Sequence, residues 1–135
     1  MSFGGNLPRH QSTFIPGQGW PYFDTQDFRT MRRIPPVFDE QSIIAALEIA
    51  VMAVQAQLPP LNGQRLSGAE STLYLRAVFA RAHADLLPEF ATQNRRDEAR
   101  NTAEDLAEQG DRFRAQSNRD IALLLGLSEN RVALI

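Results

Sequence analysis

Two pairs of adjacent prolines, Pro35–Pro36 and Pro59–Pro60, enclose a stretch of chain in which apolar residues recur at helical spacing. Proline lacks an amide hydrogen and its ring clashes with the preceding turn, so we expect a helix to end at each pair. Between the pairs, one face carries apolar residues at steps of three and four: Ile43, Leu47, Ala50, Val51, Val54 and Leu58. The pattern predicts a central helix over residues 39–58.

Other apolar residues of this helix lie outside that stripe, among them Ile44, Ile49 and Met52. A helix that is apolar around much of its circumference usually contacts more than one neighbouring element. Three further helices are expected: a short one over 24–33, with acids in its first turn and arginines in its last, one over 70–87, and a long one over 97–125. We expect Pro88 to end or kink the second and Gly126 to stop the third.

The two ends of the chain carry apolar residues without a helical period. Residues 1–23 are rich in glycine, proline and aromatic residues, whereas Val132, Leu134 and Ile135 lie in the last four positions. Each apolar end can pack either on its own domain or on another chain, because aromatic and aliphatic residues serve both purposes. The sequence thus predicts an all-α fold: an extended N-terminal arm (1–23), a small bundle of three main helices with a short N-terminal helix (24–127), and an apolar C-terminal tail (128–135).

Composition excludes several classes of function. The chain has no cysteine, so it forms neither disulfides nor thiolate metal sites, and its net charge of −2 is unlike that of a protein whose main task is to grip phosphates. His10 and His83, the two histidines, have no partner at metal-ligand spacing. Carboxylates alternate with arginines, as on a solvated face. We therefore predict no catalytic, metal or cofactor site, and no segment long enough to span a membrane.

A helix-turn-helix motif is the strongest alternative. Ala122, Gly126 and Val132 have the spacing of the close contact, the turn and the anchor in that unit. Residues 119–135 would then form a DNA-binding regulator. Against this, little chain follows the turn, and Arg131 alone would offer a positive charge to DNA.

In order and spacing, four blocks of the chain resemble the head completion proteins of contractile-tailed phages. These blocks are Trp20–Pro21 with Asp24 and Phe28–Arg29, then Val54–Leu58, then Arg76–Leu87, and finally Arg119–Asp120 with Leu124–Gly126, Arg131 and Leu134–Ile135. Together they span most of residues 20–135. The resemblance implies a structural protein of the virion neck, assembled in the host cytoplasm, with no active site.

The resemblance further implies a ring, commonly of twelve copies, that docks on the portal protein and extends its channel. Such a ring also presents a surface to the tail-side neck or terminator protein, and DNA passes through it only as cargo. We expect Trp20, Phe23 and Phe28 to serve one subunit boundary, and Arg131, Val132, Leu134 and Ile135 to serve another, at the portal. A third interpretation, a small helical dimer with an unrelated partner, stays open at this point.

Overall fold

The computed structural model describes the backbone of residues 12–93 and 99–133, and the side chains of residues 12–91 and 105–129. Four α-helices make up most of it: α1 (Thr25–Met31), α2 (Glu40–Ala56), α3 (Gly68–Gln93) and α4 (Ala99–Ala133). A short 3-10 helix, η2 (Pro59–Leu61), follows α2, and the strands β1 (Phe14–Ile15) and β2 (Phe23–Asp24) precede α1. The predicted all-α fold is confirmed.

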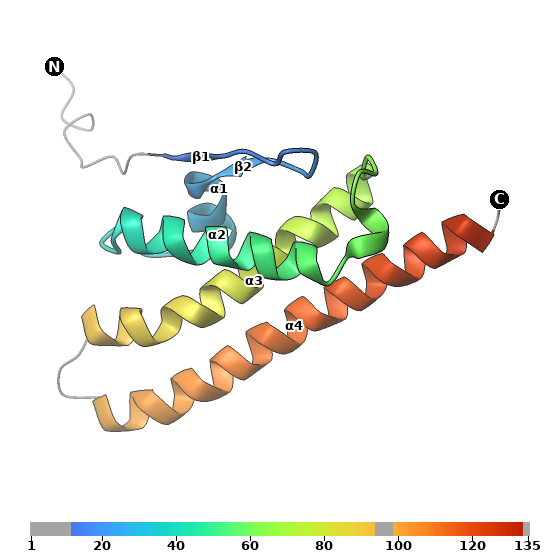
Figure 1. Cartoon of the computed structure of the whole chain (residues 1–135). Helices are drawn as coiled ribbons and strands as arrows, with labels where there is room; N and C mark the ends of the chain where they lie inside the picture. Colours follow the sequence, from blue (N-terminus) through green and yellow to red (C-terminus); the bar gives the residue numbers. More distant parts are fainter. Residues whose placement is uncertain (1–11, 94–98, 134–135) are drawn as a thin grey trace, which may run out of the picture.

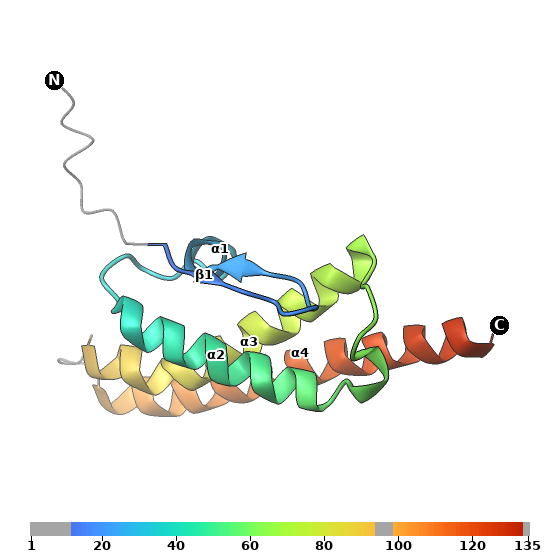
Figure 2. The same ribbon diagram turned by 45° about the horizontal axis from the view of Figure 1, so that its top comes forward.

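The long helices α3 and α4 lie antiparallel, side by side, and α2 packs on α3 (Figure 1). The strands and α1 cover the same side of the bundle as α2, and the last turns of α4 project beyond the ends of α2 and α3 (Figure 2). Both views show α2 and α4 running in the same general direction.

The two predicted N-terminal helices are defined by side-chain caps. Asp24 accepts a hydrogen bond from the backbone N–H of Asp27 at 3.0 Å, and Asp27 accepts one from the N–H of Asp24 in return. Asp39 caps α2 by accepting from the N–H of Ser42 at 3.0 Å. These bonds satisfy amides that have no partner within the helix, which is why both helices begin where the sequence predicts.

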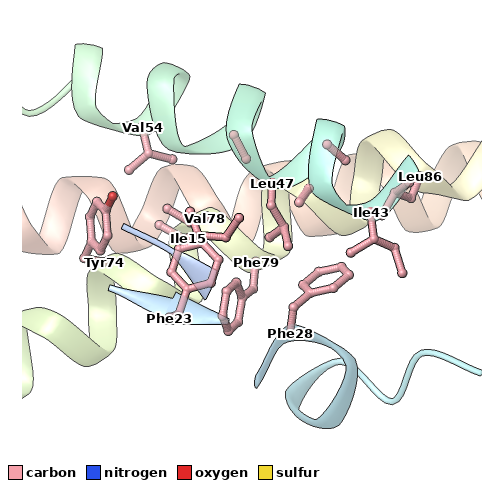
Figure 3. Close-up of a cluster of buried hydrophobic side chains, with 14 of the residues drawn as sticks. Ile15, Phe23, Phe28, Ile43, Leu47, Val54, Tyr74, Val78, Phe79 and Leu86 are labelled. Atoms are coloured by element: carbon pink, nitrogen blue, oxygen red, sulfur yellow. The ribbon is translucent and has the colours of Figure 1, made fainter. Parts of the chain in front are cut away.

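A core of aromatic and aliphatic side chains lies between α2, α3, α1 and the strands (Figure 3). The predicted stripe of α2 points into it, and Ile43, Leu47 and Val54 are fully buried. Phe79 of α3 is the centre of an aromatic group, because the rings of Phe23 and Phe28 meet it edge to face at 5.1 and 5.5 Å. Such edge-to-face pairs add to the free energy gained from burial alone.

Part of the predicted N-terminal arm is ordered against the bundle. Residues 14–24 form an antiparallel hairpin in which Phe14 is paired with Asp24 and Ile15 with Phe23, and Ile15 is buried in the core. Gly17 makes the turn possible, since a Cβ at this position would lie 1.7 Å from the carbonyl oxygen of Trp20. A two-stranded hairpin this short is at best marginally stable alone, so the burial of Ile15 and Phe23 against the bundle stabilises it.

Of the two predictions for Pro88, an end of α3 or a kink in it, the end is wrong, because α3 continues to Gln93 with the proline inside it. Leu86, Leu87 and Phe90 are all buried around the proline. Burying three large side chains gives roughly 1.5–3 kcal/mol each, which exceeds the cost of about 3 kcal/mol for a proline in a helix interior.

The helix α4 likewise runs through Gly126 to Ala133, so the predicted stop at Gly126 is wrong, and the first residues assigned to the C-terminal tail continue the helix. Leu124 and Ser128 are buried on either side of the glycine. A glycine costs only about 1 kcal/mol relative to alanine within a helix, and the packing around it outweighs that cost. At Gly110 the helix is also unbroken, and the guanidinium of Arg114 covers the glycine.

Candidate interaction surfaces

The three aromatic residues predicted to serve a subunit boundary lie against the chain's own core. Phe28 is completely buried and Phe23 is 3% exposed, so neither presents a side chain to a neighbour. Trp20 stacks on Tyr74 of α3, with ring centroids 5.2 Å apart, and is partly buried. The alternative in which Trp20 and Phe23 fold back on their own domain is therefore the one that the structure adopts, because Phe79 and Tyr74 offer them an aromatic surface.

The C-terminal residues predicted for the second boundary fall at the edge of what the structure describes. The backbone of Arg131 and Val132 continues α4, and their side chains lie outside the described set. Leu134 and Ile135 lie outside the described residues altogether.

Because residues 119–133 form one continuous helix, the turn of a helix-turn-helix unit is absent from them, and the DNA-binding alternative is corrected.

A buried polar cluster fixes the hairpin and α1 on the start of α2. Glu40 accepts hydrogen bonds from the hydroxyls of Thr25 and Thr13, at 2.6 and 2.8 Å, and from Nη2 of Arg29 at 3.1 Å. Burial alone would raise the pKa of Glu40, but these hydrogen bonds and the charge of Arg29 outweigh it and lower the pKa. The carboxylate is thus held ionised, and it holds three separate segments together.

A second cluster joins α1 to both long helices. Nε of Arg32 donates to Nδ1 of His83 at 2.9 Å, and Nη1 donates to Gln116 at 3.3 Å. The guanidinium also lies 4.5 Å from the centre of the Phe113 ring. Desolvation, followed by the nearby charge of Arg32, lowers the pKa of His83 to about 4. Neutral His83 therefore acts as a hydrogen-bond acceptor here, a structural role for the histidine that sequence reasoning left without one.

A third set of polar contacts joins α3 to α4. Arg76 donates from Nε and Nη2 to the two carboxylate oxygens of Asp120, at 2.8 and 2.7 Å, and Asp120 is almost fully buried. Ser117 donates to the carbonyl of Ala77 at 2.9 Å. Two parallel bonds between a guanidinium and a carboxylate fix both distance and orientation, so this pair sets how the two long helices lie against each other.

Two exposed apolar stripes remain on the described surface of the helices. The first, on α2, contains Ile49 and Met52, which are 58% and 71% exposed. The second, near the end of α4, contains Leu123 and Leu127, 54% and 42% exposed. Sequence reasoning noted that Ile49 and Met52 lie off the buried stripe. It missed Leu123 and Leu127, although their separation of four residues places them on one face.

Beside the α2 stripe, a groove runs between α2 and α3. It is lined by Gln41, Ser42, Ala45, Ala46, Ile49, Asp85 and Glu89. The wall formed by α2 is largely apolar, and the wall formed by α3 carries two carboxylates. A groove of this composition fits an apolar side chain that is flanked by a positive charge.

The described residues contain no group of three or more histidines, aspartates or glutamates that could hold a metal ion. Nor does a described helix combine the length and hydropathy required to cross a bilayer.

Comparison with known proteins gives two findings. Residues 61–135, which include α3 and α4, match the family described as "Phage head completion protein (GPL)". A protein described as "Probable head completion/stabilization protein", from Haemophilus phage HP1 (strain HP1c1), is 32% identical over 113 residues, which cover 70% of this chain and 75% of that protein. No solved structure matches the chain.

Proposed function

The chain belongs to the phage head completion protein family, and from that premise we propose that it is a subunit of the connector between head and tail. Membership in this family makes it a structural component of the virion head, in a family that is not one of enzymes. Within that role, we propose that it lies in the neck, forms a ring and provides the surface to which the tail attaches.

The single observation that carries the proposal is the family match over residues 61–135. This region contains the two long helices and the Arg76–Asp120 pair that fixes them. It also contains Leu123 and Leu127, which are exposed on α4. A rigid pair of helices that carries exposed leucines is suited to contacting a larger assembly, because exposed apolar side chains in a group indicate an interaction surface.

The proposed ring contains identical copies, twelve as the sequence resemblance implies, docked on the portal protein. A closed ring of identical subunits uses two different faces of each copy, one for each neighbour. In this proposal, the last residues of the chain, Arg131, Val132, Leu134 and Ile135, contact the portal, and the opposite end of the ring receives the tail-side protein. DNA passes through the channel, whose lining is acidic or of mixed charge so that the passing phosphates do not adhere to it.

Interruption of the gene in its phage tests the proposal. A stop codon early in the reading frame should leave packaged heads without tails, and the intact gene supplied from a plasmid should restore tailed, infectious particles. A second plasmid that encodes the chain without Leu134 and Ile135 should restore the protein level but not the tails. Tailed, infectious virions formed in the absence of the protein would overturn the proposed function.

A further inference from the structure

We propose that the α2 stripe and its acidic groove on one copy bind the exposed stripe of α4 on the next copy. The inference rests on the proposed function, because it names the two faces by which the subunits of the ring meet. The receiving face consists of Ala45, Ile49, Met52 and Ala56 with Glu48, Asp85 and Glu89. The entering face consists of Arg119, Leu123 and Leu127.

The receiving face combines an apolar strip with a carboxylate border. Ala45, Ile49, Met52 and Ala56 follow one another on α2 at steps of four, three and four residues and are all exposed. Glu48 and Glu89 are also exposed beside them, and Asp85 lies 3.9 Å from Arg114 of its own chain. The face is therefore apolar along its centre and negative along its edge.

The entering face has the complementary composition. Arg119, Leu123 and Leu127 lie at steps of four on α4, so they form one narrow exposed stripe with a positive charge at its first position and leucines at the next two. Eight residues of helix from Arg119 to Leu127 span about 12 Å, and the eleven from Ala45 to Ala56 on the receiving face span about 16 Å. The entering stripe therefore fits within the length of the receiving face.

The charges favour contact between a receiving face and an entering face over contact between two receiving faces. Two receiving faces placed against each other would bring Glu48 and Glu89 of one copy toward the same carboxylates of the other, and like charges opposite one another oppose binding. An entering face instead brings Arg119 toward these carboxylates. Contacts between two different faces are the kind that build a closed ring.

The charges also set the direction of the contact. Glu89 borders the groove together with Gln41 and Ala45, at the start of α2. If Arg119 lies there, Leu123 falls beside Ile49 and Leu127 beside Met52, so that α4 of one copy runs parallel to α2 of the next. Within one chain α2 and α4 already run in the same general direction (Figures 1 and 2). If the symmetry axis of the ring runs along these helices, rotation about it keeps α4 of one copy parallel to α2 of the next.

The two faces lie on different sides of the α3–α4 pair. Arg114 and Asp120 flank the buried face of α4, about 120° apart around the helix. Arg114 reaches Asp85, which borders the receiving groove, whereas Asp120 binds Arg76. Leu123 and Leu127 follow Asp120 by three and seven residues, on its side of the helix. One copy can therefore use both faces at once.

Disulfide trapping tests this contact, since the chain has no natural cysteine. The full-length variant Met52→Cys with Leu127→Cys should give, under mild oxidation, a ladder of covalent oligomers larger than the dimer. Each single variant should give almost none. The matched control, Ala45→Cys with Leu127→Cys, places the thiols about 10 Å further apart along the proposed register and should give little ladder.

A charge reversal provides an independent readout that does not depend on thiol geometry. Glu89→Arg and Arg119→Glu should each raise the concentration at which half of the chain is assembled by about tenfold, as measured by native mass spectrometry and light scattering. The double variant should recover at least half of that loss, because the two exchanged charges then attract each other across every boundary.

Dimers as the main product of the single Met52→Cys variant would overturn the proposal, because they would show a contact between two α2 faces. A chain that forms rings without a Met52–Leu127 ladder would also overturn it while leaving the connector function intact. In contrast, a ladder in a phage that needs no such protein for its tails would support the contact and refute the proposed function.

Discussion

Replacement of Phe28 by alanine distinguishes a core residue from a boundary residue. The side chain is completely buried and its ring lies 5.5 Å from Phe79. A buried phenylalanine truncated to alanine destabilises a protein by about 3–5 kcal/mol, through lost burial and the cavity left behind. Since small domains are stable by only about 5–15 kcal/mol, this change removes a large part of the stability of the monomer.

Urea denaturation measures this loss under conditions in which the chain is monomeric. Trp20, the only tryptophan, stacks on Tyr74, so its fluorescence reports docking of the hairpin while circular dichroism reports the helices. Phe28→Leu, a milder change of about 1–2 kcal/mol, ensures a measurable transition if the alanine variant does not fold.

Met31→Ala is the matched control, because Met31 lies on the same helix and is exposed; its free energy of unfolding should change by less than about 0.5 kcal/mol. If Phe28→Ala left the denaturation midpoint unchanged but abolished assembly, the assignment of this residue to the core would be refuted.

Three further predictions concern the clusters and the long helix. Glu40→Gln leaves the buried guanidinium of Arg29 without its counter-charge and should cost about 3–5 kcal/mol in urea denaturation, and a change below about 1 kcal/mol would contradict the role of the cluster. Gly126→Ala should stabilise the chain by about 0.5–1 kcal/mol, since a Cβ there meets nothing within 4 Å, whereas destabilisation would indicate a turn at this position. Because the pKa of His83 is about 4 in the folded chain against 6.5 ordinarily, the unfolded state binds more protons between these values. Stability from neutral His83 is thus lost as the pH falls through this range, and His83→Gln should show a smaller loss of urea midpoint between about pH 7 and pH 4.5 than the natural chain does.

Local signals were sufficient to predict where most helices lie. The caps at Asp24 and Asp39 and the stripe of α2 depend on residues close together in sequence, and such signals are readable without a structure. The ends of α3 and α4 could not be predicted in this way. These helices continue through Pro88 and Gly126 because the neighbouring residues are buried against distant parts of the chain. Local propensity is a weak guide wherever tertiary packing opposes it.

The hairpin shows the same limitation. Its strands are too short to show an alternating pattern, so the glycines, prolines and aromatic residues of 1–23 predicted an extended arm. Only the docking of Ile15 and Phe23 on the core around Phe79 explains why the segment is ordered. Likewise, neither the Arg76–Asp120 pair nor the groove beside Glu89 could be predicted, since each joins helices whose relative placement the sequence leaves open.

Cryo-electron microscopy of the mature virion that carries this protein tests the central claim most directly. The account predicts a ring of density between portal and tail into which the α3–α4 pair fits, with α2 of each copy beside α4 of its neighbour. Mature virions whose neck contains no copy of this chain would contradict it.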